Sequence, residues 1–163
     1  MTKVLLFDLG NVVLTNDHPF HTPEQLGQFC DYFGVTVDNL ELAFSVAFHP
    51  YSLGETTEEG FWKKYLSTAR AAKMDIEYAK IVWRRNQAEN EHMLSLLATL
   101  RESYRIAALS TIPKEWFEFK RDKFKLGDYF DPIVTSGELG VRKPDPKVYE
   151  IALTRLDTAP DNV

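Results

Sequence analysis

The chain has 163 residues, of which 44% are hydrophobic and 26% are charged, and its formal net charge is −5. A chain of this size can bury a proper core, and its acidic balance argues against nucleic-acid binding, which needs a concentrated basic face. Cys30 is the only cysteine, which excludes an internal disulfide. No apolar stretch approaches the roughly 20 residues of a membrane span. We therefore expect a cytoplasmic protein that binds neither nucleic acid nor membrane.

The first predicted element is a strand over Val4–Phe7, a short apolar run of the kind that is buried on both faces of a parallel sheet. The strand ends at Asp8, and a turn through Gly10 follows. Ligands of open α/β sheets bind at the carboxyl ends of strands, so Asp8 is a candidate nucleophile for attack on phosphorus. From position alone, a carboxylate that caps the turn is the commoner interpretation.

Helical patterns fill the next part of the chain. Helices are predicted after Thr22-Pro23 and Thr56-Thr57, and over Val37–Phe48 and Asp75–Arg85. This change of pattern within an α/β chain predicts an inserted helical cap over residues 16–87. The core domain would then consist of residues 1–15 and 88–163.

Several conspicuous side chains receive ordinary structural interpretations. Trp62, Trp83 and the phenylalanines of the cap are expected to form its core rather than a substrate pocket. The basic residues between Lys114 and Lys125 are expected on a solvated helix face. The histidines near the cap are more typical of surface or packing positions than of substrate contacts; they are His18, His21 and His49.

The last part of the chain returns to the sheet. It is predicted to hold helices over Asn90–Ser103, Lys114–Phe124 and Pro146–Leu156, and strands over Ile106–Leu109 and Pro132–Val134. Ser110 and Thr111 follow the first of these strands, where hydroxyls either bind phosphate oxygens or cap the next helix. Lys143 precedes Pro144, which restricts its backbone. This lysine could neutralise a carboxylate and a phosphate, although an isolated lysine is usually a surface residue.

Together these residues supply what phosphoryl transfer needs, which is a nucleophile, donors to the phosphoryl oxygens and a cation. Their motifs also resemble those of the haloacid dehalogenase (HAD) superfamily, in the same order. Phe7–Val12 resembles motif I, Leu109–Thr111 resembles motif II, and Gly137–Asp145 resembles motif III and its lead-in. The helical insertion resembles a C1 cap. Within the superfamily, the chain looks most like the α-D-glucose-1-phosphate phosphatase group.

The resemblance implies a Rossmann-like parallel core and a role for each motif residue. Asp8 would be the nucleophile and a Mg²⁺ ligand, and the main-chain carbonyl of Gly10 would be a second ligand. The phosphate-binding groups would be Ser110, Thr111, Asn11 and Lys143, and Lys143 would also pair with Asp8. Magnesium suits such an oxygen-rich site and offsets the repulsion between Asp8 and an anionic substrate.

Two departures from the pattern matter. Gly10 stands where many HAD phosphatases carry an aspartate that serves as general acid and base. Asp17 in the following loop is a candidate substitute, and the alternative is a loop carboxylate that caps the next turn. The resemblance also implies a further strand whose acidic residues form motif IV, and Val163 would be about its first residue. We therefore expect a chain truncated before motif IV, with an exposed first strand that promotes self-association.

The sequence favours a Mg²⁺-dependent phosphomonoester hydrolase that acts on a small phosphorylated metabolite such as a sugar phosphate. One alternative is a catalytically impaired domain that acts as a binding or interaction module. The other is a 2-haloacid dehalogenase, which uses the same nucleophile on carbon, although its motif I differs from the Asp8–Val12 segment.

Overall fold

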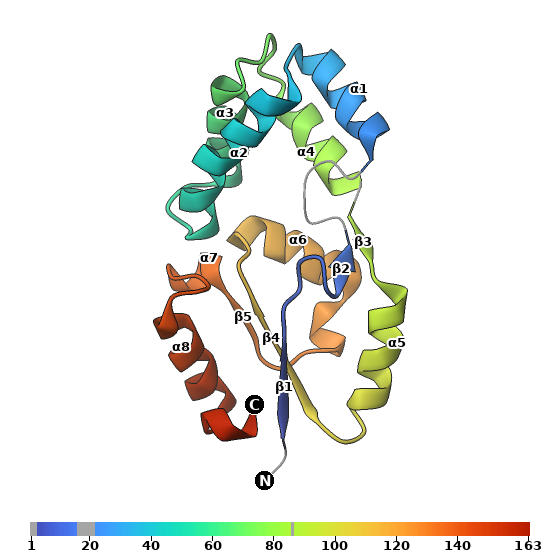
Figure 1. Ribbon diagram of the computed structural model, residues 1–163, viewed down its shortest axis with the longest axis vertical. Coiled ribbons are helices and arrows are strands. Elements are labelled where there is room, and N and C mark those ends of the chain that lie inside the picture. Colours follow the sequence, from blue (N-terminus) through green and yellow to red (C-terminus); the bar gives the residue numbers. More distant parts are fainter. Residues whose placement is uncertain (1–2, 16–21, 86) are drawn as a thin grey trace.

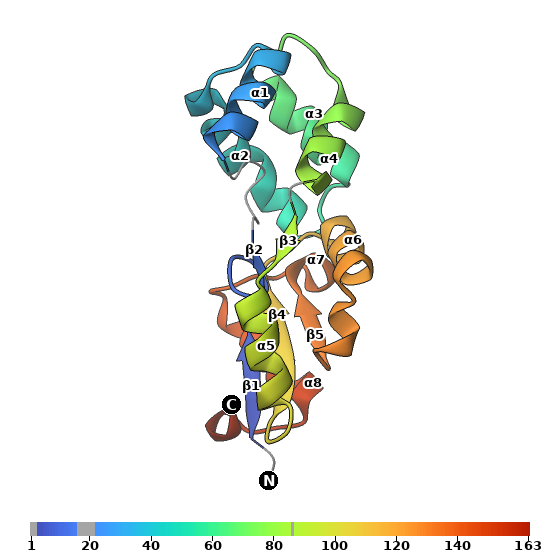
Figure 2. The ribbon, with the colours of Figure 1, turned by 90° about the vertical axis from the view of Figure 1, so that its right-hand side faces the viewer.

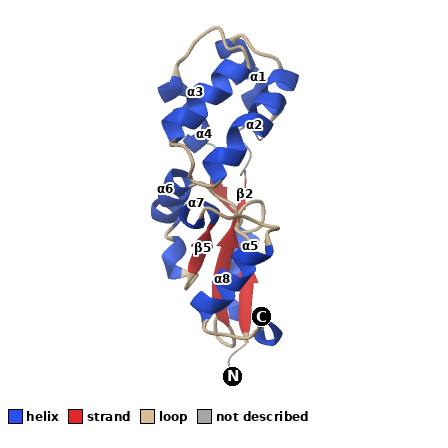
Figure 3. Ribbon diagram, turned by 90° about the vertical axis from the view of Figure 1, so that its left-hand side faces the viewer, coloured by secondary structure: helices blue, strands red, loops and turns tan. Residues whose placement is uncertain are grey.

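The computed structural model describes residues 3–15, 22–85 and 87–163. In this part of the chain, β1 (Val4–Phe7), β4 (Arg105–Ser110) and β5 (Ile133–Thr135) form a parallel sheet in the order β1-β4-β5. The strands point with their carboxyl ends toward the cap helices (Figure 1 and Figure 3). The predicted α/β fold with a parallel sheet is therefore confirmed. The strand β1 lies at one edge of the described sheet, and self-association through it stays a prediction.

Helices cover both faces of the sheet. They are α5 (Glu91–Leu100) and α6 (Lys114–Phe124) on one face and α8 (Pro146–Leu156) on the other. The side chains of β4 alternate between these faces, as a pleated strand requires. Ile106 and Ala108 pack with Leu97 of α5, whereas Leu109 packs with Val148 of α8. This layering fixes the carboxyl end of β4, where the candidate phosphate-binding residues follow.

Helices α1 to α4 form the cap above the sheet (Figure 1). Their bounds are α1 (Pro23–Phe33), α2 (Val37–Ser52), α3 (Glu58–Thr68) and α4 (Ile76–Arg85). Thr22, Thr36 and Thr57 each accept a hydrogen bond from the backbone N–H three residues later, which caps the first three helices. The antiparallel strands β2 (Leu14–Thr15) and β3 (Ala88–Glu89) connect cap and core (Figure 2). None of the described helices is both long and apolar enough to span a membrane.

The predicted elements agree with the structure most closely where caps or prolines mark their ends. The strand over Val4–Phe7 and the helices over Lys114–Phe124 and Pro146–Leu156 have the predicted bounds. Helix α2 runs to Ser52, beyond the predicted end, and includes Pro50 in its last turn. The short elements α7 (Ser136–Leu139), η1 (Leu126–Asp128) and η2 (Pro160–Asn162), together with β2 and β3, were not predicted because they are too short to show a periodicity.

Two predictions about side chains need correction. Trp62 and Trp83 are fully buried as expected, but Phe44 and Phe48 are only partly buried and line a cavity. Lys120 is not on a solvated face, because it has no exposed surface and its Nζ lies 5.5 Å from the centre of the Trp83 ring. His49 is exposed. Asp17, His18 and His21 lie outside the described residues.

Candidate active site

An ion pair joins the first and third motif segments at the upper edge of the sheet. The Nζ atom of Lys143 lies 2.8 Å from Oδ2 of Asp8, and the other carboxylate oxygen accepts the backbone N–H of Leu9 at 2.8 Å. The side chains of Asp8 and Lys143 are 42% and 24% exposed, respectively. The carboxylate is thus held by two donors while part of it remains open to a ligand.

The turn after β1 is held by its own backbone. Leu9 is fully buried, and its carbonyl accepts the N–H groups of Val13 and Leu14 at 3.1 and 2.9 Å. Asn11 has a positive φ of 55°, a left-handed conformation that asparagine tolerates better than most residues. The tight turn places Asn11 on the cap side of Asp8, where it lines the cavity described below.

Asn90 is a positioning residue that the sequence did not single out. Its side-chain amide donates to the carbonyl of Val12 at 3.0 Å, and its backbone N–H donates to the carbonyl of Val13 at 2.9 Å. The same side chain accepts the N–H of Met93 and so caps α5. A helix was predicted over Asn90–Ser103, but the link from Asn90 to the first motif depends on tertiary structure.

The second motif lies beside the first. Because Phe7 of β1 pairs with Ala108 of β4, Asp8 and Ser110 follow at the same end of adjacent parallel strands. Ser110 is buried, and Thr111 is half-buried at the wall of the cavity. The structure thus brings Asp8, Lys143, Asn11 and Thr111 to one edge of the sheet, where the buried Ser110 ends β4.

The cap is fixed to the core next to this edge. The hydroxyl of Ser136 donates to the carbonyl of Ser52 at 2.6 Å, and the guanidinium of Arg142 donates to the Ser52 hydroxyl at 3.3 Å. Gly54 and Gly137 approach so closely that a Cβ atom on Gly54 would lie 2.7 Å from the Gly137 carbonyl oxygen. These contacts hold the end of α2 against α7 and the third motif segment.

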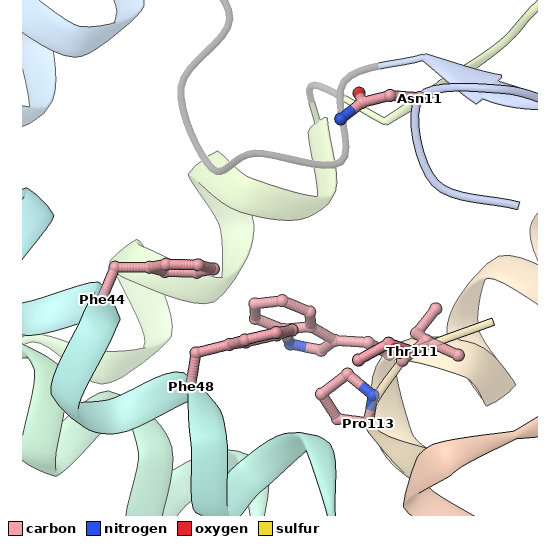
Figure 4. Close-up of a pocket in the computed structure, with 7 residues that line it drawn as sticks. Asn11, Phe44, Phe48, Thr111 and Pro113 are labelled. Atoms are coloured by element: carbon pink, nitrogen blue, oxygen red, sulfur yellow. The ribbon is translucent and has the colours of Figure 1, made fainter. Parts of the chain in front are cut away.

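A cavity of about 260 Å³ lies between the cap and the core (Figure 4). It is lined by Phe44 and Phe48 of α2, by Asn11, and by Thr111, Ile112, Pro113 and Trp116 of the segment after β4. Most of the exposed surface in the cavity is therefore aliphatic or aromatic. The two polar side chains, Asn11 and Thr111, belong to the segments that directly follow Asp8 and Ser110.

The fit of a magnesium ion can be judged from the oxygen ligands on this edge. Mg²⁺ is usually held by one or two carboxylates together with substrate phosphate oxygens and water. Asp8 offers one partly exposed carboxylate, and the rest of the coordination shell would come from a carbonyl, the substrate and water. No cluster of three or more His, Cys, Asp or Glu residues suited to a metal occurs within residues 3–15, 22–85 and 87–163. The site therefore fits a substrate-assisted magnesium site rather than an all-protein cage.

Comparison with known proteins assigns the chain to a class. A profile of the haloacid dehalogenase-like hydrolases matches residues 40–163, so the chain belongs to this family of hydrolases. The chain is also similar to drimenol cyclase drtB from Aspergillus calidoustus, with 26% identity over 170 residues. That match covers 100% of this chain and 30% of the cyclase, so the chain spans less than a third of that relative's length.

Solved structures share the fold at lower identity. A HAD family enzyme from Bacteroides thetaiotaomicron, in complex with magnesium and inorganic phosphate, has a TM-score of 0.78 and 22% identity over 99% of this chain and 82% of its own. A 2-haloacid dehalogenase from Pseudomonas syringae pv. Tomato DC3000 has a TM-score of 0.60 and 18% identity, covering 97% of this chain and 74% of its own. The fold is therefore compatible with more than one hydrolytic chemistry.

Proposed function

We propose that this hydrolase is a Mg²⁺-dependent phosphomonoester hydrolase that acts through an aspartyl-phosphate on a small phosphorylated metabolite. The ion pair between Asp8 and Lys143 at the carboxyl edge of the sheet carries the proposal. It offers an oriented nucleophile beside a cation that offsets the negative charge of a phosphate. The magnesium and phosphate bound by the similar Bacteroides enzyme support it further. A sugar phosphate is one example of such a metabolite.

Residues of this site account for the attack on phosphorus and for the binding of the phosphoryl oxygens. A carboxylate oxygen of Asp8 attacks phosphorus, the bond from phosphorus to the ester oxygen breaks, and that oxygen takes a proton from an acid or from water and leaves as the alcohol. Water then attacks the aspartyl-phosphate and releases inorganic phosphate, which restores the carboxylate. Lys143 orients the carboxylate and binds the phosphoryl oxygens, assisted by Ser110 and Thr111. Asn11 also binds the phosphate.

Magnesium would be bound by Asp8 and the main-chain carbonyl of Gly10, and it would supply positive charge against the phosphoryl oxygens. Gly10 has no side chain to protonate the leaving alcohol. Asp17 remains a proposed donor; it lies outside the described residues, and an Asp17→Ala variant with unchanged turnover would remove it from the mechanism.

Two alternative functions can be tested with the same protein. In the first, Asp8 attacks the carbon of a 2-haloacid and displaces the halide, and the fold shared with a 2-haloacid dehalogenase supports this alternative. A phosphate-binding module would bind inorganic phosphate without turnover. The deciding experiment compares release of phosphate from 4-nitrophenyl phosphate and release of chloride from 2-chloropropionate, with and without Mg²⁺. We expect Mg²⁺-dependent release of phosphate that Asp8→Asn abolishes. Release of chloride without release of phosphate would contradict the phosphatase and support the dehalogenase.

A further inference from the structure

We propose that the cavity between α2 and the segment after β4 is a leaving-group subsite for an apolar ring. This inference rests on the proposed function, and it narrows the substrate to a phosphate monoester of a small aromatic or cyclic alcohol rather than of a sugar. The cavity adjoins the phosphate site, because Asn11 follows Asp8 within one turn and Thr111 follows Ser110 directly.

One end of the cavity is lined by polar side chains and the other by apolar ones. The polar side chains are Asn11 and Thr111, which belong to the proposed phosphate site. Among the residues that the structure describes, the remaining wall is apolar, and Figure 4 shows Phe44 and Phe48 of α2 opposite Asn11. A sugar would bring several hydroxyl groups against this wall, and each hydroxyl would lose hydrogen bonds to water without a replacement. An apolar ring instead gains free energy when it leaves water.

Two aromatic rings give this wall a defined shape. The rings of Phe44 and Phe48 stack with their centroids 4.7 Å apart and their planes at 15°. The ring of Phe48 also lies 6.0 Å from that of Trp116, which is buried. Phe61, further inside the cap, is fully buried, whereas Phe44 and Phe48 each keep exposed surface toward the cavity. Aromatic pairs favour such offset contacts with a further planar ring.

The wall is preformed and of limited size. Ser136 and Arg142 bind Ser52 and so hold the end of α2, the helix that carries both phenylalanines. Preorganised contacts give affinity because less ordering accompanies binding. The volume of about 260 Å³ exceeds the volume of about 150 Å³ that accepts benzene in an apolar protein cavity. A volume of this size accommodates one ring or a fused pair of rings.

The test compares esters of primary alcohols that differ in polarity but not in reaction type. Benzyl phosphate and cyclohexylmethyl phosphate are compared with glucose 6-phosphate by kcat/KM. We expect kcat/KM for both ring esters to exceed that for the sugar ester by about 10- to 100-fold, as burial of an aromatic side chain implies. In Phe48→Ala this ratio should fall about tenfold. In Tyr78→Ala, which removes a partly buried aromatic side chain elsewhere in the cap, the ratio should not change.

Binding separates this inference from the proposed function. Benzylphosphonate, which is not hydrolysed, is titrated against wild type by calorimetry beside inorganic phosphate. Benzylphosphonate that binds more tightly than inorganic phosphate to wild type, and less tightly to Phe48→Ala than to wild type, would support the subsite. If no ester were hydrolysed in that case, the proposed function would be wrong but the subsite would stand. Equal binding of both anions by wild type, or a preference for glucose 6-phosphate among the esters, would overturn the inference whether or not Phe48→Ala folds.

Discussion

The indole rings of Trp83 and Trp116 stack with their centroids 4.2 Å apart and their planes at 20°. Trp83 belongs to α4 of the cap, and Trp116 belongs to α6 of the core. Trp116 also makes an edge contact with Phe61 at 5.2 Å and with Tyr51 at 5.3 Å. The hydrophobic core of the cap therefore includes a side chain of the other domain, and the two parts are expected to unfold together.

Removal of the Trp116 side chain should destabilise both parts of the protein. Trp116→Ala is expected to lower the free energy of unfolding by about 3–5 kcal/mol, because it leaves a large cavity among aromatic rings. Urea denaturation followed by circular dichroism measures the change. Tyr149→Ala is the control, because Tyr149 is 41% exposed and its loss should change stability by less than about 0.5 kcal/mol. Equal stability of the two variants would contradict the role assigned to Trp116.

Gly137 is expected to tolerate no side chain. A Cβ atom there would lie 2.5 Å from the backbone nitrogen of Lys114 and 3.0 Å from the carbonyl oxygen of Ile112. Both are backbone atoms, so Gly137→Ala should lower the free energy of unfolding by about 1–3 kcal/mol. Thermal unfolding measures this change.

Gly27 supplies the matched control for that substitution. It lies within α1, and a Cβ atom there would meet nothing within 4 Å. Gly27→Ala should therefore raise stability by about 0.5–1 kcal/mol, since alanine loses less backbone entropy in a helix. If both substitutions changed stability in the same direction, the close approach at Gly137 would not explain the effect.

Asp75 should make stability depend on pH in acid. Its carboxylate accepts the Tyr32 hydroxyl at 2.6 Å and the Tyr78 N–H at 3.0 Å. These hydrogen bonds, the first more than the second, lower the pKa of Asp75 in the folded protein. The resulting stability is fully present above the unfolded pKa of about 3.9 and is lost as the pH falls through the lower folded pKa.

The variant Asp75→Asn isolates this contribution. It should melt at a lower temperature than wild type at neutral pH, and the difference in Tm should shrink below about pH 4. Melting curves of both proteins at a series of pH values measure the difference in Tm. The other carboxylates are present in both proteins, so their effects on Tm cancel in this difference. A difference in Tm that stays constant into acid would show that the carboxylate charge is not responsible.

Lys143 should matter for turnover more than for folding. Lys143→Met removes the cation beside Asp8 and is expected to lower kcat/KM for an aryl phosphate by about 100- to 1,000-fold, the usual effect of losing one charge-stabilising group. Lys147→Met, an exposed lysine four residues later, should retain wild-type kinetics. If both variants retained turnover, the ion pair would have no catalytic role.

Most of the fold could be predicted from local patterns. The strand before Asp8 is a short apolar run between polar residues, and the threonine caps and Pro23 mark the starts of the cap helices. The end of α2 was harder to delimit, because the predicted helix stopped at Phe48 whereas the structure continues through Pro50 to Ser52. The pair β2 and β3 has two residues in each strand, so tertiary contacts rather than periodicity determine it.

Site residues that belong to sequence motifs could be predicted, whereas residues that reach the site only through packing could not. Asp8 and Lys143 were singled out by the motif segments, and the structure places them in contact. Phe44 and Phe48 have the spacing of ordinary core residues, and only the arrangement of α2 over Thr111 leaves them at a cavity. Asn90 was predicted only as the start of a helix, and its bond to Val12 joins segments far apart in sequence.

Direct detection of the phosphoryl group on Asp8 tests the central claim. The protein would be mixed with 4-nitrophenyl phosphate and Mg²⁺, quenched in acid within the first turnover, digested, and analysed by peptide mass spectrometry. We expect the mass of one phosphoryl group on the peptide that contains Asp8, and its absence in Asp8→Asn. Turnover without a phosphorylated Asp8 peptide, or phosphorylation of another residue in Asp8→Asn at the wild-type rate, would contradict the account.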